Sequence, residues 1–580
     1  MHKICRRVLR GTVAALLFSG VPLRAQFTTP HVIATPGEVS ATLGETTFIN
    51  HGLQGVGRIS GSALDIFGET FGSVSSLQVT NWTSNASGSY TGTFNILPDR
   101  GYNNNNAGGF FSDYAARIQQ MDFSFTPYTG SASIGGSDLG SRIAAQNQIT
   151  ITSPITGVKF TYADPNTGNG FAFTSGLDPA AGQSTLFGNS LPYVSNYTGQ
   201  AFPGATANTT YADINKLALD AEALVLKADG SGYVGDEYGA NIYYFNANKQ
   251  IVGVITPPDA LRPHKGTGSP LNFNSTTPPD NGRRNNQGFE GVALSPDGKR
   301  LFALLQSAAV QDTNGAAMGT RTNTRMLVYD VAGNALPDAP VAEYVIQLPT
   351  YTANGNGGAV NATAAQSEII AIDDHRLLVL SRDANGQGSL MTNPSMYKSV
   401  LLVDLSVGTP TNIAGTAHDA TGATVTASPG TLDSSITPLS WTEALNILNS
   451  AQLSKFNIDL DPGGTNQITK LTLGEKWEGM SLVSANDPLA PNDYFLFIAN
   501  DNDFLTGTGK MVGPDGTIQS YDAWSNGYAA NRVPTAATVA ATTENDTMFL
   551  AYRVTVVPEP CSALLISGGA AGLLARRRRR

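Results

Sequence analysis

Four glutamates each stand at the head of a short apolar segment that has the length of a β-strand: Glu222, Glu290, Glu368 and Glu478. A turn and a second apolar segment follow each of them, and two of these second segments end in acids: Asp236, Glu237, Asp501 and Asp503. Carboxylate oxygens are the ligands that Ca²⁺ and Mg²⁺ prefer. The pattern predicts a site for a hard divalent cation if these acids converge.

A structural role for the glutamates is the alternative. Each carboxylate would then accept hydrogen bonds from the backbone of a neighbouring strand, because buried acids need such partners. Acids that converge also repel one another unless a cation, an arginine or a lysine compensates their charge. The sequence leaves both roles open.

Arginine accompanies aspartate at two second-segment ends, in Asp99-Arg100-Gly101 and in Arg382-Asp383. A guanidinium next to a carboxylate site can bind an anionic oxygen through two parallel hydrogen bonds. An ion pair that holds neighbouring sheets together explains the same pattern equally well. Arg100 and Arg382 are therefore candidate ligands for an anionic substrate.

The glutamates recur because a β-hairpin recurs. In segment 288–305, the turn Ser295-Pro296-Asp297-Gly298 separates two apolar runs; Pro fixes φ and Gly accepts a positive φ. Three other segments repeat this unit, and third or fourth strand candidates follow in several of them. We expect an all-β fold, a β-propeller of six or seven blades with long loop insertions. The glutamates would then face one mouth of its channel.

Several segments depart from the repeat. Segment 129–212 is predicted to be a blade remnant with long loops, and segment 257–287 to contain no strand while being the most basic part of the chain. Tyr114–Gln120 is a short helical candidate. Ser440 and Glu443 form a capping-box pattern, which predicts a helical insertion that continues to about Ser454.

The ends of the ring can also be predicted. A hairpin formed by Arg58–Ile66 and Tyr90–Gly101 is expected to open the first blade. Met548–Val556 is expected to be a last strand that completes this first blade and so removes an exposed sheet edge.

Both termini resemble targeting segments. Residues 1–26 combine a basic start, an apolar run and a cleavable end, which is typical of a secretory signal peptide. Residues 557–580 contain Val557-Pro558-Glu559-Pro560, an uncharged segment and five arginines, and they closely resemble the PEP-CTERM sorting signal of Gram-negative bacteria. That resemblance implies export to the envelope or the medium, a transient transmembrane anchor and recognition by sorting machinery.

Removing both segments leaves no cysteine, because Cys5 and Cys561 lie within them. It also leaves 25 basic and 44 acidic residues, a formal net charge of −19. Such a charge argues against nucleic acids as partners and suits metal cations. The Gly-x-Ser-x-Gly and Walker A motifs are absent from the sequence, and its histidines are scattered, so serine-hydrolase, P-loop and zinc chemistry lack support.

The ordered motifs resemble the phytase-like family described as having esterase-like activity of phytase. They are Asp99-Arg100-Gly101, Asp220-Ala221-Glu222-Ala223, Gly235-Asp236-Glu237-Tyr238-Gly239, Gly288-Phe289-Glu290-Gly291, Ser367-Glu368-Ile369, Lys476-Trp477-Glu478-Gly479 and Asn500-Asp501-Asn502-Asp503-Phe504. The resemblance implies a propeller over residues 27–556, a calcium-rich carboxylate site and hydrolysis of phosphate or other esters. Gln306 and Ser381 stand where the family pattern leads us to expect acids.

Two functions follow from this sequence. As an enzyme, the protein would be a calcium-dependent hydrolase of phosphorylated or other ester small molecules, with Arg100 or Arg382 holding the anion and Glu290 acting as base. As a non-catalytic protein, it would be a calcium-stabilised propeller that binds exopolysaccharide or a partner protein. We expect a monomer in either case.

Overall fold

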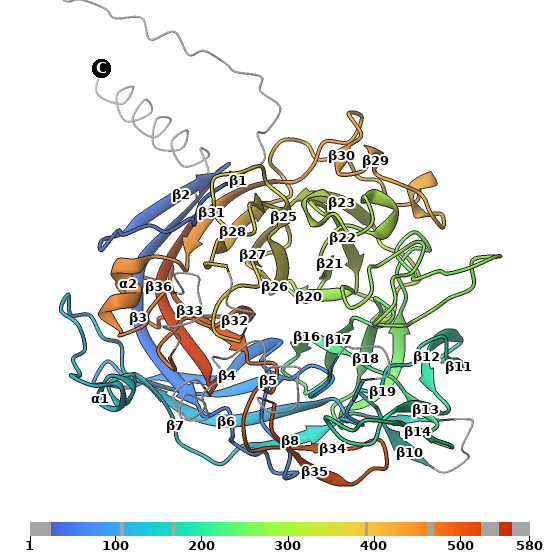
Figure 1. The fold of residues 1–580 in the computed structure, drawn as a ribbon. Coiled ribbons are helices and arrows are strands. Elements are labelled where there is room, and N and C mark those ends of the chain that lie inside the picture. Colours follow the sequence, from blue (N-terminus) through green and yellow to red (C-terminus); the bar gives the residue numbers. More distant parts are fainter. Residues whose placement is uncertain are drawn as a thin grey trace, which may run out of the picture.

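The repeated hairpins form five large sheets that stand side by side around a common centre (Figure 1). The computed structural model describes residues 25–104, 109–164, 170–388, 393–460, 469–523 and 544–558. The hairpin of 288–305 illustrates the local cause: Gly298 has φ of +75°, and its N–H donates to the Ser295 carbonyl at 2.8 Å. The predicted all-β class is confirmed.

The large sheets are given from the innermost strand outward. Sheet 1 contains β4 (Ser76–Ser84), β5 (Tyr90–Leu97), β6 (Arg117–Phe125), and β7 (Ile149–Ile151) and β8 (Thr156–Lys159), both paired with β6. Sheet 2 contains β16 (Ala221–Leu226), β17 (Gly232–Asp236), β18 (Ile242–Phe245), β19 (Gln250–Ile255), β9 (Thr161–Ala163) and β10 (Phe171–Phe173). Sheet 3 contains β20 (Phe289–Leu294), β21 (Arg300–Leu305), β22 (Asn323–Asp330) and β23 (Ala342–Gln347).

Sheet 4 contains β26 (Ala365–Ala371), β27 (Arg376–Arg382), β28 (Lys398–Asp404) and β31 (Ser440–Asn446). Sheet 5 contains β32 (Lys476–Ser484), β33 (Asp493–Asp501), β36 (Thr547–Pro558), β3 (Thr46–Ile59) and β2 (Val39–Leu43). Small sheets pair β1 (Gln26–Phe27), β24 (Thr350–Tyr351) and β25 (Ala362–Thr363); β11 (Gln183–Leu186), β12 (Asn189–Val194) and β15 (Lys216–Leu217); β13 (Tyr197–Gln200) and β14 (Asn208–Tyr211); β29 (Thr426–Ser428) and β30 (Thr431–Leu432); and β34 (Gly509–Val512) and β35 (Ile518–Tyr521). The helices are α1 (Leu139–Ala144) and α2 (Ser450–Lys455), with 3-10 turns at Val310–Asp312, Met318–Thr320 and Ala417–Asp419.

The innermost strands close a ring. Strand β4 contacts β16, β16 contacts β20, β20 contacts β26, β26 contacts β32, and β32 contacts β4 again. A separate apolar cluster fills each of the five sheet-to-sheet interfaces. Apolar burial between neighbouring sheets, at about 25 cal/mol per Å², therefore holds the whole ring together.

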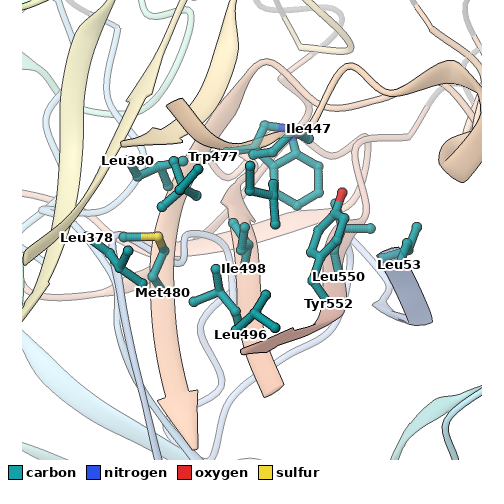
Figure 2. Close-up of a cluster of buried hydrophobic side chains, with 14 of the residues drawn as sticks. Leu53, Leu378, Leu380, Ile447, Trp477, Met480, Leu496, Ile498, Leu550 and Tyr552 are labelled. Atoms are coloured by element: carbon teal, nitrogen blue, oxygen red, sulfur yellow. The ribbon is translucent and has the colours of Figure 1, made fainter. Parts of the chain in front are cut away.

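The interface between sheets 4 and 5 shows this packing (Figure 2). Leu378 and Leu380 of β27 face Trp477 and Met480 of β32, and all four side chains are almost fully buried. The indole N–H of Trp477 donates to the Gly474 carbonyl at 3.0 Å, so the one polar atom of this ring is satisfied.

The N-terminal strands β2 and β3 and the C-terminal strand β36 meet in sheet 5, which corrects two expectations. Strand β36 lies between β33 and β3, so it completes the last sheet and not the first. Residues 58 and 59 belong to β3, and the partner of β5 is β4, so Arg58–Ile66 does not open the first sheet. The long β3 pairs with β36 from Thr46 to Ile59. The N-terminal strand β3 therefore lies on the outer side of β36 in sheet 5.

The helix predicted over 440–454 is wrong for residues 440–446 and confirmed for residues 450–454. Residues 440–446 form strand β31, and α2 begins only at Ser450, after its N-cap Asn449. The carboxylate of Glu443 accepts from Ser399 Oγ at 2.9 Å and contacts His31 Nε2 at 3.0 Å, so it is not available to cap a helix. Pairing of β31 with β28 overrides the local capping pattern. The short helical candidate Tyr114–Gln120 is also wrong, because Arg117–Gln120 lies in strand β6.

The described residues contain five large sheets, fewer than the six or seven blades predicted. Segment 129–212 forms no sheet of its own in this ring, because β7 and β8 extend sheet 1 while β9 and β10 extend sheet 2. Segment 257–287 contains no strand, as predicted. Buried Arg283 holds this loop by donating to the carbonyls of Tyr238 and Phe273.

Most of the predicted signal peptide and sorting segment lies outside the described residues. Among the described residues of the chain, no helix is long and apolar enough to cross a membrane.

Closure by β36 predicts that its apolar side chains are needed for stability. Leu550 is fully buried, whereas Leu489 is 95% exposed. We expect Leu550→Ala to lower the free energy of unfolding by about 3 kcal/mol, since it leaves a cavity, and Leu489→Ala to change it by less than about 0.5 kcal/mol. Urea denaturation followed by tryptophan fluorescence measures both; equal midpoints for the two variants would contradict the assigned closure.

Candidate functional site

Strand ends from all five sheets converge on one cavity of about 210 Å³, called the carboxylate cavity. Its lining contains eight acids: Asp99, Asp220, Glu222, Glu237, Glu290, Glu478, Asp501 and Asp503. It contains three bases, Arg100, Arg382 and Lys476, together with Gly101, Asn103, Asn286, Gln287 and Gln306. Six of the eight predicted metal ligands thus lie in one place.

A β-bulge positions three of the glutamates. Glu222, Glu290 and Glu478 are each the extra residue where the register between the first and second strands of a sheet shifts. Such a bulge re-aims the side chain of the extra residue. The repeated bulge explains how three different sheets direct a carboxylate into the same cavity.

Glu368 is not part of this set. In sheet 4 the bulge residue is Ser367, and Glu368 is paired with Leu380 one position later. One position reverses the direction of a strand side chain. Glu368 therefore lines a second cavity of about 380 Å³ farther along the first strands, where it accepts hydrogen bonds from Ser76 Oγ at 2.6 Å and from its neighbouring N–H of Ile369 at 3.0 Å.

Asp236 also lies outside the lining of the carboxylate cavity. Its carboxylate accepts from the N–H groups of Asp220 at 3.2 Å, Tyr238 at 3.1 Å and Gly239 at 2.8 Å. Asp236 was predicted as a metal ligand, but these contacts give it a structural role in the turn that presents Glu237.

The acids form two triplets in which one oxygen of each member lies within 4.8 Å of the others. The Asp99 triplet consists of Asp99, Asp501 and Asp503, and the Glu222 triplet of Asp220, Glu222 and Glu237. Asp99 and Asp220 were not predicted as ligands. The sequence could have indicated both residues as ligands. Asp99 precedes Arg100 at a second-strand end, and Asp220 precedes Glu222 by two residues.

The three bases pair with these acids. Arg100 Nη1 lies 2.7 Å from Asp220 Oδ2, and Lys476 Nζ lies 3.2 Å from Asp501 and 2.5 Å from Asp503. Arg382 Nη2 donates to Glu478 Oε1. The arginines join sheet 1 to sheet 2 and sheet 4 to sheet 5, which is the ion-pair role weighed as their alternative.

Burial and mutual repulsion raise the pKa of several acids. Desolvation is the main cause for Glu222 and Glu290, whose pKa values lie well above the ordinary range, followed by the charges of Glu290 and Glu237 respectively. Desolvation also raises the pKa of Glu237 to about 7, and that of Asp501 to about 7 although Lys476 opposes this. Without added positive charge, some of these carboxyl groups therefore keep their protons near neutral pH.

The donor set fits a hard cation. Asp220 Oδ1, Glu237 Oε1 and Glu290 Oε2 are buried oxygens that accept from no N–H or hydroxyl donor. The carboxyl groups of Glu237 and Glu290 hydrogen-bond to each other, which requires a proton on one of them. Unpartnered buried carboxylate oxygens are unfavourable unless a proton or a cation neutralises them. Glu290 Oε1 accepts from Gln306 Nε2, so Gln306 orients this carboxylate at a position where an acid was expected.

A further triplet of potential ligands, Asp373, Asp374 and His375, lies in the turn between β26 and β27. Asp373 accepts from the N–H groups of His375 at 3.0 Å and Arg376 at 2.8 Å, and its other oxygen pairs with the Arg376 side chain. These contacts make it a turn-forming residue.

Comparisons with known proteins agree with the motifs. The family model described as "Phytase-like: Esterase-like activity of phytase" matches residues 70–504. An "Uncharacterized secreted protein" of Arthroderma benhamiae is 30% identical over 490 residues, which cover 80% of this chain and 89% of that relative.

Two solved structures that match this chain have low sequence identity to it. The S. cerevisiae core factor is 8% identical over 93% of this chain and 68% of its own, with a TM-score of 0.24. Kluyveromyces lactis Hsv2 is 10% identical over 57% of this chain and 94% of its own, with a TM-score of 0.19.

The raised pKa values predict how stability depends on pH. Glu237 and Asp501 bind a proton more tightly in the folded than in the unfolded chain. The stability that these two groups contribute is therefore fully present below their ordinary pKa values and is lost as pH rises through about 7. In calcium-free buffer with chelator, we expect unfolding free energy to fall by at least about 1 kcal/mol between pH 5 and pH 8. Glu237→Gln should flatten this decrease; a profile that rises toward pH 8 would contradict it.

Proposed function

The chain belongs to the phytase-like family, and on this premise we propose that it is an exported, calcium-dependent hydrolase of phosphoric or other esters. The observation that carries the proposal is the carboxylate cavity, where eight acids face three bases and three buried oxygens accept from no N–H or hydroxyl donor. The family description supports ester hydrolysis as the reaction class.

We propose that the ring of five sheets is a five-bladed β-propeller. Three observations support this: the cyclic contacts of the innermost strands, the apolar cluster at each interface, and the pairing of the N-terminal strand β3 with the C-terminal strand β36 in sheet 5. A propeller of this kind places the starts of all first strands at one mouth of the channel, which is where the carboxylate cavity lies.

Calcium is the proposed metal because the donors are all carboxylate oxygens. The Asp99 triplet and the Glu222 triplet are the residues that would hold it. Bound there, calcium would supply positive charge that polarises the ester and offsets the negative charge of the attacked group.

The residues of the chain supply the remaining roles. Glu290 is the proposed general base, because Gln306 holds its Oε1 while its Oε2 accepts from no N–H or hydroxyl donor. Burial and Glu237 raise its pKa, so Glu290 would accept a proton from water once added positive charge in the cavity has displaced its own proton. Arg382 binds Glu478 through Nη2 and retains a buried, unpartnered Nε that can donate to an anionic oxygen of the substrate. Arg100 contributes positive charge beside Asp220.

A non-catalytic, calcium-stabilised propeller that binds exopolysaccharide or a partner protein is the second candidate. Specific observations favour it: Arg100 and Arg382 already pair with carboxylates, and Gln306 and Ser381 replace two expected acids. Ser381 Oγ donates to the Ala364 carbonyl at 2.9 Å, which is a structural contact.

Export rests on the predicted signal peptide and on the secreted relative. We propose that the mature chain acts in the envelope or the medium, as a monomer and without a nucleic acid partner, after the PEP-CTERM segment has been recognised by sorting machinery.

Calcium binding by the two triplets predicts a large gain in thermal stability. Calcium at 100 times its dissociation constant should stabilise the protein by about 2.7 kcal/mol, and by more at pH 8 than at pH 5 because the ligands must lose their protons. Calorimetric titration and melting curves measure this effect. We expect Asp99→Asn and Glu222→Gln to weaken calcium binding and Asp374→Asn, in the exposed turn, to leave it unchanged; a loss confined to Asp374→Asn would move the site to that turn.

The role of Glu290 predicts the kinetics of its variant. Glu290→Gln keeps the shape and removes the base, so kcat/KM on phosphomonoesters, including phytate, should fall by about 100-fold or more while calcium-dependent melting persists. Glu368→Gln is the matched control, since Glu368 is equally buried but lies in the other cavity, and it should retain activity. Calcium-dependent melting of the wild type without turnover of any ester would favour the non-catalytic function.

A further inference from the structure

The turn that presents Asp503 to the carboxylate cavity has an unusual backbone. Asp503 and Phe504 follow strand β33 and have φ values of +54° and +53°. This left-handed region is unfavourable for residues other than glycine, and more so for a bulky residue such as phenylalanine than for aspartate. Two such residues in succession persist only where the surrounding structure holds them, and backbone strain of this kind clusters at functional sites.

The ring of Phe504 is held by a close approach to Gly72, in the segment between β3 and β4. A Cβ atom added to Gly72 would collide with Cδ1 and Cε1 of this ring, so only glycine leaves room for it. The Gly72 carbonyl accepts from Thr547 Oγ1 at 3.0 Å, which fixes this segment against β36. The Phe504 side chain is 1% exposed, so it is enclosed on its other sides as well.

Hydrogen bonds hold the turn itself. Asp501 Oδ1 accepts from the Asp503 N–H at 2.6 Å, and Asn502 Oδ1 accepts from the Phe504 N–H at 2.9 Å. The phenol of Tyr521 donates to the Phe504 carbonyl at 2.6 Å. The backbone that joins Asp501 to Asp503 is therefore fixed while both carboxylates line the cavity.

One aromatic cluster supports both arms of the Asp99 triplet. We call it the aromatic support; it contains Tyr102, Phe110, Tyr114, Phe504, Leu505, Met511, Tyr521 and Ala523. Gly101, two residues after Asp99, packs so tightly that an added Cβ would lie 2.7 Å from Cβ of Tyr114. The Tyr114 ring meets the Phe504 ring edge to face, with centroids 5.7 Å apart. The segment after Asp99 and the segment after Asp503 thus rest on each other through aromatic rings.

We propose that the aromatic support sets the spacing of Asp99, Asp501 and Asp503, and that Phe504 is the positioning residue of this triplet. Asp99 follows a strand of sheet 1, whereas the other two acids follow or end a strand of sheet 5, so no single sheet fixes their spacing. Ligands that packing already holds in place bind a metal more tightly. The inference rests on the proposed function for calcium, and on the described contacts alone for the support.

Filling space is not a sufficient role for Phe504. An apolar side chain that only fills a core can be placed by an unstrained backbone, but Phe504 reaches its position through two successive residues with positive φ. The same two residues place the Asp503 carboxylate next to Lys476. The strained turn is explained if the position of this carboxylate is what the ring maintains.

Calcium calorimetry separates positioning from stability. We expect Phe504→Ala to weaken calcium binding by about tenfold or more, and the milder Phe504→Leu to weaken it less. Phe495→Ala is the matched control, because Phe495 is also 1% exposed but lies at the other end of β33, in the interface with sheet 1. It should lower the melting temperature and leave calcium affinity unchanged.

Two outcomes of this comparison would overturn the proposal. Unchanged calcium affinity in Phe504→Ala would leave the calcium site but remove the role of the ring. An equal loss in Phe495→Ala would mean that affinity simply follows stability. Circular dichroism at the temperature of the titration confirms that each variant is folded.

The close approach at Gly72 supplies a double-mutant test. The methyl group of Gly72→Ala must displace the Phe504 ring, so we expect about tenfold weaker calcium binding in the wild-type background. In the Phe504→Ala background no ring stands in the way, and the same change should weaken binding by less than about threefold. Equal effects in the two backgrounds would overturn the coupling of Gly72 to the site.

A crystal structure of calcium-free Phe504→Ala tests the support without the metal. We expect residues 503 and 504 to adopt negative φ and the Asp503 carboxylate to separate from Lys476. Positive φ retained at both residues would overturn the positioning role. A wild type that binds no calcium, together with a relaxed turn in the variant, would reject the proposed calcium site and retain the support.

Discussion

The burial of many carboxylates at one end of a ring of sheets is the constraint on which this structure depends. Eight acids line a cavity of about 210 Å³ with three bases. Taking such groups out of water disfavours their charged forms, and their proximity adds repulsion. Lys476, Arg100 and Arg382 compensate part of this negative charge. The remaining carboxylates must be neutralised by bound protons or by a cation.

The scaffold makes that concentration of charge possible. Each interface between neighbouring sheets has its own apolar cluster, and β36 pairs with the N-terminal strand β3 in sheet 5. The favourable free energy of these interfaces offsets the unfavourable electrostatics at the mouth. The bulges at Glu222, Glu290 and Glu478 then direct side chains of rigid strands, so a small irregularity in pairing builds the site.

A smaller cavity of about 100 Å³ shares Gln287, Gln306 and Arg382 with the carboxylate cavity. The loop of residues 257–287 provides Gln287 to this shared lining, and Arg283 anchors the loop by donating to the carbonyls of Tyr238 and Phe273.

The sequence by itself determined the strands and turns of the hairpins, the all-β class and most acids of the site, because alternation, turn chemistry and strand-end position are local properties. Tertiary structure decided the rest. Only strand pairing distinguishes Ser367 from Glu368 at the bulge of sheet 4, and only pairing with β28 makes Ser440–Asn446 a strand. The partners of Arg100 and Arg382, the ligands Asp99 and Asp220, and the number of sheets depend on contacts between residues far apart in the chain, whose register no local pattern specifies.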